Sequence, residues 1–381
     1  MADLKTNNKL SEEERMKQMA EQMQAAEYKG LSEEEIRERE RQKEMRRKKN
    51  MEILEDTLGI LEKRSFKKDG QEIKLQFSSE QMREIQVFLP GDIDALRSEM
   101  TFVSETAAEI VSAADDAGSD ESRTQALSGC TFGCENIDAL LLVQRKYLEL
   151  KGNGDSDPRV LVLNLASSTH PGGQTRKGAS AQEEDLCRRT SLLLSLESDE
   201  AKKYYDYNNA RKTHMGSDGV MISPYVEVIK DGSSETLSEP FPISVMSCAA
   251  PMIRLGLEGM TQQEYEVMLC HRIQGMLLTA ASLNYRHLIL GAFGCGVFGN
   301  DAAVVSNLFY HVIQNFSFDG RGSDQVFDSI DFAVLCRPGK DYNYREFCRN
   351  FSRKGDSCTA GNGISFSAGG MNFDHEKPGH L

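Results

Sequence analysis

The 381-residue sequence lacks any run of the roughly eighteen consecutive apolar residues that a membrane-spanning helix needs. Its first residues, Met1 to Asn7, also lack the apolar core of a secretory signal peptide. None of the nine cysteines has CxxC spacing, and the closest pair, Cys130 and Cys134, would need two further ligands to hold zinc. We therefore expect an intracellular protein, cytoplasmic, nuclear or both, with free and mostly buried thiols, no membrane association and no metal.

Positive charge is also scarce, because 45 Lys and Arg face 59 Asp and Glu and give a formal net charge of −14. An acidic protein is repelled by phosphate backbones and anionic membrane surfaces. We therefore expect no direct DNA binding. A polyanionic ligand would have to be held by backbone amides and helix N-termini rather than by a field of Lys and Arg.

Large apolar residues are few in the first 64 positions. Ser11 and Ser32 each precede three glutamates, a pattern typical of helix starts. The segment then turns basic at residues 46–49, Arg-Arg-Lys-Lys, which indicates a solvated helix end in preference to a nuclear import signal. We predict a charged helical or disordered extension over residues 1–64 that contributes little core and is dispensable for chemistry.

Apolar runs alternate with helical patterns over residues 65–351. This alternation predicts an α/β fold, a three-layer α/β/α sandwich around a mostly parallel mixed sheet, and the continuous runs indicate strands covered on both faces. The predicted strands are 85–89, 160–166, 220–226, 243–249, 287–291 and 330–336, and the predicted helices are 136–150, 181–196, 261–283, 301–316 and 341–351. The Gly- and Ser-rich residues 352–381 are expected to form a flexible tail.

Two predicted strand ends carry unusual loops, and open α/β sheets bind ligands beyond the carboxyl ends of their strands. After strand 160–166 come Pro171-Gly172-Gly173 and then a helix start with the sequence Gln-Glu-Glu-Asp at 182–185. After strand 287–291, a loop with four glycines in nine residues leads to Asn300 and can expose backbone N–H groups to a phosphate. This second loop fits neither the Walker motif nor the dinucleotide-binding motif. It indicates a phosphate site only together with the first loop.

The acidic helix start allows two interpretations. Ser180 and Glu183 fit a capping box, in which Glu183 would serve only as a structural cap. Glu184 and Asp185 have no such role, although first-turn acids also favour the helix dipole. The dipole favours ionised carboxylates and crowding favours retention of a proton, so the sequence leaves the protonation state open. His170 is either a site residue or a turn cap.

These motifs resemble those of the microbial-type poly(ADP-ribose) glycohydrolases, a branch of the macrodomain fold, over roughly residues 124–349. The family signature is three glycines, a spacer of six to eight residues and then Gln-Glu-Glu. Here Gln174 stands in place of the third glycine, and the spacer of seven residues runs from Thr175 to Ala181. Residues 291–300 resemble the family's phosphate loop.

The resemblance implies roles for individual residues. Glu184 would protonate the departing ribose oxygen and then activate water, while Glu183 would hold ribose hydroxyls near the scissile bond. Phe298 would stack on the terminal ribose, and the amides near it would hold the diphosphate. The implied substrate-binding residues are Asn164, Gly172, Gly173, Gln182, Gly294, Cys295, Gly296, Val297 and Phe298.

The implied activity is hydrolysis of ribose–ribose O-glycosidic bonds at polymer ends. The substrate would be poly(ADP-ribose) or ADP-ribosylated proteins, the product would be ADP-ribose, and no cofactor is expected. The alternative is a non-catalytic ADP-ribose reader whose glutamates only cap the helix. The intact pair Glu183 and Glu184 favours the enzyme. Gln174 in place of the third glycine leaves the non-catalytic reader as an alternative. A phosphatase acting on ADP-ribose phosphate is a more distant option that would not need paired glutamates.

Overall fold

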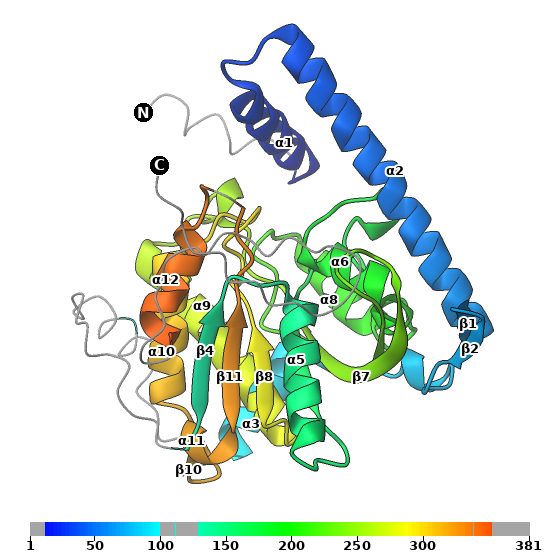
Figure 1. Ribbon diagram of the computed structural model, residues 1–381. Helices are drawn as coiled ribbons and strands as arrows, with labels where there is room; N and C mark the ends of the chain where they lie inside the picture. The colour runs from blue at the N-terminus through cyan, green and yellow to red at the C-terminus, as the bar shows by residue number, and fades with distance from the viewer. Residues whose placement is uncertain (1–11, 100–110, 112–128, 338, 353–381) are drawn as a thin grey trace, which may run out of the picture.

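A computed structural model of the chain describes residues 12–99, 111, 129–337 and 339–352 (Figure 1). Its centre is a seven-stranded sheet with the strand order β3-β6-β7-β5-β8-β11-β4. Neighbours from β7 to β4 pair parallel, whereas β6 pairs antiparallel with β3 and β7. The mostly parallel mixed sheet predicted from the sequence is confirmed.

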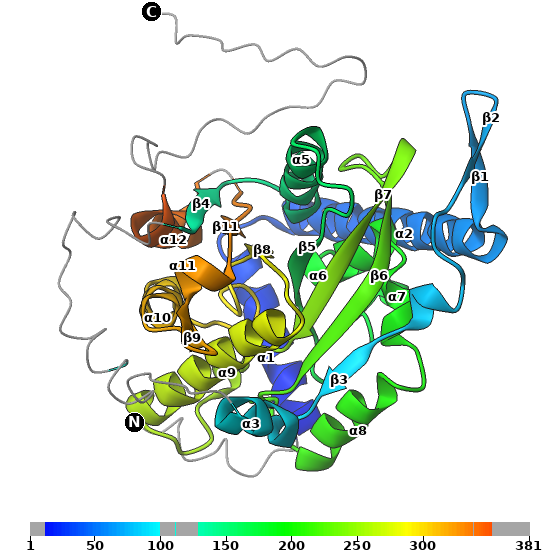
Figure 2. The same ribbon diagram turned by 90° about the horizontal axis from the view of Figure 1, so that it is seen from below.

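Helices cover both faces of this sheet (Figure 2). One core cluster joins alternate strand side chains such as Leu161 and Leu163 to the helices α9, α10 and α12. The other cluster joins Val160 and Val162 to the helices α5, α6, α7 and α8. Successive residues of one strand thus pack on opposite layers, as expected for a buried parallel strand. The three-layer architecture is confirmed.

The six predicted strands are all present in the central sheet, and its seventh strand was missed. The missed strand, β4, lies at the sheet edge, and only two of its five residues are buried, so it lacks a continuous apolar run. Two small hairpins add β1 (Ser65–Lys68) with β2 (Gln71–Lys74), and β9 (Ser317–Phe318) with β10 (Arg321–Gly322). The sheet strands are β3 (Gln86–Phe88), β4 (Thr131–Glu135), β5 (Val160–Leu165), β6 (Val220–Lys230), β7 (Thr236–Cys248), β8 (His287–Leu290) and β11 (Ser329–Ala333).

The single helix predicted over 181–196 is two helices. Thr190 interrupts it because this residue is extended and forms a bridge with Val228 of β6. The helices are α1 (Glu12–Tyr28), α2 (Glu33–Lys63), α3 (Pro90–Glu99), α5 (Ala139–Gly152), α6 (Gln182–Arg189), α7 (Leu192–Leu196), α8 (Lys202–Arg211), α9 (Gln262–Ser282), α10 (Ala302–Gln314), α11 (Ser323–Val326) and α12 (Tyr342–Phe351). Short 3-10 turns are η3 (Gln81–Arg83), η4 (Thr175–Lys177) and η5 (Ile253–Leu255).

The N-terminal segment is helical, as predicted, but half of α2 belongs to the folded body. Ser32 caps α2 in a capping box with Glu35, which confirms that helix start, while Ser11 lies outside the described residues. Leu54 and Leu61 are buried in core clusters. Thr57 donates a hydrogen bond of 2.6 Å to a carbonyl of α6. The boundary predicted after residue 64 is therefore too late, and the packed unit begins within α2.

The described residues also bear on membrane spans, metal sites and thiols. No described helix is long and apolar enough to cross a membrane. Within the described ranges, no group of three or more His, Cys, Asp or Glu side chains is arranged to hold a metal ion. Cys348 is disulfide-bonded, so the expectation of free thiols throughout does not hold there. Cys130 and Cys134 are free and buried. Residues 353–381 of the predicted tail lie outside the described residues.

Candidate active site

The two loops singled out from the sequence follow β5 and β8, which are neighbouring parallel strands. Their carboxyl ends therefore meet at the same edge of the sheet (Figure 1). A third loop follows β7, the other neighbour of β5, and ends in η5. Here Arg254 contacts the loop after β8, because its backbone N–H donates to the Phe298 carbonyl at 3.0 Å and Nη2 donates to the Gly296 carbonyl at 3.1 Å.

Glu183 turns inward rather than capping its helix. The N-cap of α6 is Ala181, which makes no side-chain capping bond, so the capping box with Ser180 is wrong. The Glu183 carboxyl, only 3% exposed, instead accepts hydrogen bonds from the Ser167 backbone N–H at 2.7 Å and from Asn164 Nδ2 at 3.3 Å. Glu183 therefore does not serve as a helix cap.

The environment of Glu183 favours its neutral form. Burial is the largest cause and raises its pKa to about 8, against an ordinary value of 4.5. Hydrogen bonds from the Ser167 amide, Asn164 and the Gly172 amide act in the opposite direction, while the neighbouring Glu184 raises the pKa further. In the folded protein Glu183 therefore retains a proton up to and beyond neutral pH.

Glu184 has one carboxylate oxygen held and one unpaired. Its side chain is 7% exposed, and Oε1 accepts a hydrogen bond of 3.0 Å from the Gln174 backbone N–H. Oε2 is buried and has no hydrogen-bond partner in the described part of the chain. The same is true of Oδ1 of Asn164, whose Nδ2 binds Ser247 Oγ at 3.0 Å. Buried polar atoms are rarely left unpaired, so this pair of acceptors indicates a site for a ligand with hydroxyl donors.

The glycine turn explains how the backbone approaches both acids. Gly173 has a φ of +59°, and a Cβ there would lie 2.6 Å from Glu184 Oε1 and 2.9 Å from Glu183 Oε2. Gly172 has a φ of +64° and is equally crowded by side chains of α6 and α7. Gln174, in contrast, has a φ of −106° and an exposed side chain. The departure from the third signature glycine therefore requires no backbone strain.

Gln182 is the residue whose place differs most from expectation. Its Oε1 accepts from the Leu165 backbone N–H at 2.8 Å, and its Nε2 donates to the Leu163 carbonyl at 2.7 Å. Both ends of the amide are thus occupied by the β5 backbone. These bonds fix the start of α6 against β5, and the substrate contact implied for Gln182 stays a prediction.

Asp185 and His170 lie apart from the glutamate pair. Asp185 receives the guanidinium groups of Arg188 at 3.3 Å and Arg189 at 2.7 Å. Of the three neighbouring carboxylates, only those of Glu183 and Glu184 therefore lie together in the candidate site. The exposed His170 ring lies 2.8 Å from the Thr169 hydroxyl, which favours the interpretation as a turn residue.

The loop over residues 291–300 is held by Asn300, which the sequence analysis did not single out. Asn300 Nδ2 donates to the Gly294 carbonyl at 2.9 Å, and Oδ1 accepts from the Tyr265 hydroxyl at 2.7 Å. Gly294 has a φ of +74°, and a Cβ there would lie 2.2 Å from Asn300 Nδ2. Glycine is required at this position, and Asn300 fixes the loop's shape.

Three successive amides of this loop are available. Among the described residues, the N–H groups of Gly296, Val297 and Phe298 donate to no protein acceptor, whereas that of Cys295 donates to the Ala292 carbonyl at 3.1 Å. Burial raises the pKa of the Cys295 thiol, which stays protonated. Val297 is 49% exposed, and Phe298 is half-buried against the core. Consecutive free amides of this kind form an anion-binding concavity.

A buried arginine, Arg272, holds two loops together. Arg272 of α9 donates to Asp218 at 3.0 Å and to the carbonyls of Met215 and Ala249 at 2.9 and 2.7 Å. It therefore pins the end of β7 to the loop before β6. Sequence reasoning missed it because Arg272 stands in an apolar helical pattern, with no local signal for partners 23 to 57 residues away.

Comparisons with known proteins point to one family of glycohydrolases. Residues 54–231 match the family model of the microbial-type PARG catalytic domain, where PARG is poly(ADP-ribose) glycohydrolase. The structure is similar to that of PARG from Thermomonospora curvata, with a TM-score of 0.65 and 25% identity over 80% of this chain and 99% of that one. The same enzyme bound to the inhibitor ADP-HPD gives a TM-score of 0.64 with 26% identity and the same coverage of both chains.

A second organism gives the same result. PARG from Deinococcus radiodurans in complex with ADP-ribose matches with a TM-score of 0.56 and 26% identity, over 73% of this chain and 98% of that one. No curated relative matches the chain at a significant level. The fold is macrodomain-like, as in these solved glycohydrolase structures. The family match over residues 54–231 and the similar solved structures agree with the resemblance to the microbial-type poly(ADP-ribose) glycohydrolases found in the sequence.

Proposed function

We propose that this protein hydrolyses the ribose–ribose O-glycosidic bond at the ends of poly(ADP-ribose) and releases ADP-ribose, with Glu184 as general acid and base. The observation that carries the proposal is the buried, unpaired Oε2 of Glu184 beside a second buried glutamate. A polar ligand group would complete the hydrogen bonding of this oxygen. The family relationship supplies the substrate class.

The proposed reaction has one proton donor and one nucleophile. Glu184 gives its proton to the departing ribose oxygen as the bond from that oxygen to the anomeric carbon breaks. It then takes a proton from water, whose oxygen bonds to the anomeric carbon. Such acid–base catalysis typically contributes about 10²- to 10⁴-fold to the rate.

Glu183 has a positioning role in this proposal. Its carboxyl is fixed by Ser167, Gly172 and Asn164, and its raised pKa keeps a proton available for donation to a ribose oxygen. The free amides of residues 296–298 would hold the diphosphate, and Phe298 would pack on the terminal ribose. Backbone donors of this kind suit an acidic chain that binds a polyanion by its end. We also propose that the protein acts inside the cell and binds neither DNA nor membranes directly.

The experiment is ADP-ribose release from polymer by the wild type and by Glu184→Gln. The glutamine keeps shape but cannot donate a carboxyl proton, so turnover should fall about 10²- to 10⁴-fold. ADP-ribose binding, measured by calorimetry, should persist. Glu200→Gln is a matched control because Glu200 is exposed on the surface in an ion pair with Lys203. A wild type that binds ADP-ribose without releasing it from polymer would establish the reader instead.

A further inference from the structure

The face of α2 that packs on the body continues into a row of cations. Leu61, Thr57, Leu54 and Asn50 follow one another at spacings of three or four residues and are all buried. Residues spaced in this way share one face of a helix. The same spacing, continued toward the N-terminus, reaches Arg47 and Arg46 and then Lys43. We call these three residues the basic turn.

The basic turn lies next to the loop that leads into the catalytic helix. Asn50 Nδ2 donates to the carbonyls of Gly178 and Ala179 at 3.0 and 3.3 Å. A Cβ on Gly178 would lie 2.2 Å from the Arg47 carbonyl oxygen, so the two backbones touch at this point. The loop continues directly into α6, whose first turn carries Glu184. The basic turn therefore lies near the N-terminus of α6.

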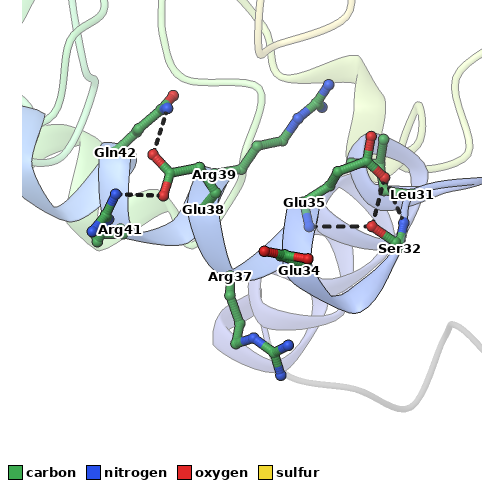
Figure 3. A pocket seen from close by; sticks show the side chains of 9 residues that line it. All are labelled: Leu31, Ser32, Glu34, Glu35, Arg37, Glu38, Arg39, Arg41 and Gln42. Atoms are coloured by element: carbon green, nitrogen blue, oxygen red, sulfur yellow. Dashed lines mark hydrogen bonds and ion pairs between the residues drawn. The ribbon is translucent and has the colours of Figure 1, made fainter.

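These cations form no ion pair with any described residue. Closer to the N-terminus, Arg37 pairs with Glu33 at 3.7 Å. Arg41 pairs with Glu38 at 2.6 Å in a pocket where α2 begins (Figure 3). Lys43, Arg46, Arg47, Lys48 and Lys49 form no ion pair with any described residue. In a chain of net charge −14, this is a cluster of five cations without an ion pair to a described residue.

The arm formed by α1 and the first half of α2 is anchored on two sides of the site. Asn50 fixes it beside α6, and α1 returns to contact η5 (Figure 1). η5 in turn holds the loop of free amides through Arg254. A polymer whose terminal unit occupies the site therefore leaves it close to this arm.

We propose that Lys43, Arg46 and Arg47 bind diphosphate groups of poly(ADP-ribose) beyond the terminal unit. The inference rests on the proposed function, because that function places the polymer end beneath the arm. Each further unit carries a diphosphate, and phosphate contacts by Lys and Arg add affinity that salt weakens. The surface thus reconciles an acidic protein with a polyanionic substrate, since the positive charge is concentrated where the polymer passes.

The test compares two triple variants of the full chain on a Glu184→Gln background, which prevents hydrolysis. The first replaces Lys43, Arg46 and Arg47 by alanine, which preserves helix propensity. The control removes the same charge from β1, β2 and η3 by replacing Lys67, Lys74 and Arg83, which are exposed and form no ion pair with any described residue. Binding of long polymer and of ADP-ribose is measured at several salt concentrations, with thermal unfolding as the check on folding.

Polymer should bind the first variant about tenfold more weakly at low salt, and the logarithmic salt slope should fall by about 2 for three lost phosphate contacts. ADP-ribose affinity should stay the same in both variants, and the control should bind polymer like its parent. Unchanged polymer binding in the first variant would overturn the proposal. So would an equal loss of ADP-ribose binding, which would make the basic turn a support for the terminal site.

Single-stranded DNA of matched phosphate content is the competitor. If it binds the parent as tightly as polymer does and loses affinity equally in the first variant, the surface is a general nucleic-acid patch and the proposal is wrong. Failure of the proposed function has a different signature. In that case the protein with intact Glu184 releases no ADP-ribose from polymer, whatever the basic turn does.

Discussion

The backbone N–H of Gln174 donates a 3.0 Å hydrogen bond to Oε1 of Glu184. This contact orients the proposed acid and depends on the backbone alone. The side chain at position 174 points to solvent, and its φ of −106° is open to any residue. The glutamine that interrupts the glycine signature therefore leaves the orienting contact in place.

Neighbouring positions in this turn should respond differently to substitution. Gly173→Ala should lower turnover by about 10²-fold or more, because its Cβ would displace both carboxylates and its φ is positive. Gln174→Ala should change turnover by no more than about twofold, as for an exposed surface change. Steady-state ADP-ribose release by the two variants checks this. Equal losses would show that the side chain of Gln174 takes part in the site.

Glu183 should make the folded protein less stable as pH rises. Its folded pKa of about 8 exceeds the ordinary 4.5, so its stabilising contribution is complete below about 4.5 and is lost as pH rises through about 8. Within that window the slope for one group is at most about 1.4 kcal/mol per pH unit. Glu183→Gln should remove this slope. Thermal unfolding of both proteins from pH 5 to 8 measures it, and parallel curves would contradict the assignment.

Phe298 distinguishes a ligand contact from a core contact. The ring is half-buried at the edge of a core cluster. Phe298→Ala should weaken ADP-ribose binding or turnover strongly, while stability should fall by much less than the roughly 3–5 kcal/mol typical of emptying a core Phe site. Calorimetry and thermal melts on one sample measure both quantities. A large stability loss with unchanged affinity would place Phe298 in the core.

Truncation within α2 should impair folding and activity, whereas truncation before α2 should not. A chain that begins at Ser65 loses Leu54 and Leu61, and each lost buried Leu costs about 2–5 kcal/mol. It also loses Asn50, so we expect poor folding and little activity. A chain that begins at Leu31 keeps these contacts and should unfold cooperatively with turnover near that of the full chain. Full activity from Ser65 would contradict the packing described for α2.

The sequence predicted well those features whose signal is local. Continuous apolar runs revealed the strands β5 to β8, and glycines next to Gln-Glu-Glu marked the candidate site, because both patterns lie within a few positions. The role of Asn50 had no such signal, since its partner Gly178 is 128 residues away. The same holds for Arg272. The polar run of α8 was missed because only Tyr204, Tyr205 and Asn208 of this helix are buried.

The contact between α2 and the loop before α6 links catalysis to a local unfolding equilibrium. If the part of α2 around Asn50 detaches from the folded body, Asn50 loses its hydrogen bonds to the carbonyls of Gly178 and Ala179. The loop before α6 is then no longer held by α2. Opening of this kind is often less costly than global unfolding. On warming, the proposed activity should then be lost before the sheet unfolds, and amide exchange in α2 should report the temperature at which this happens.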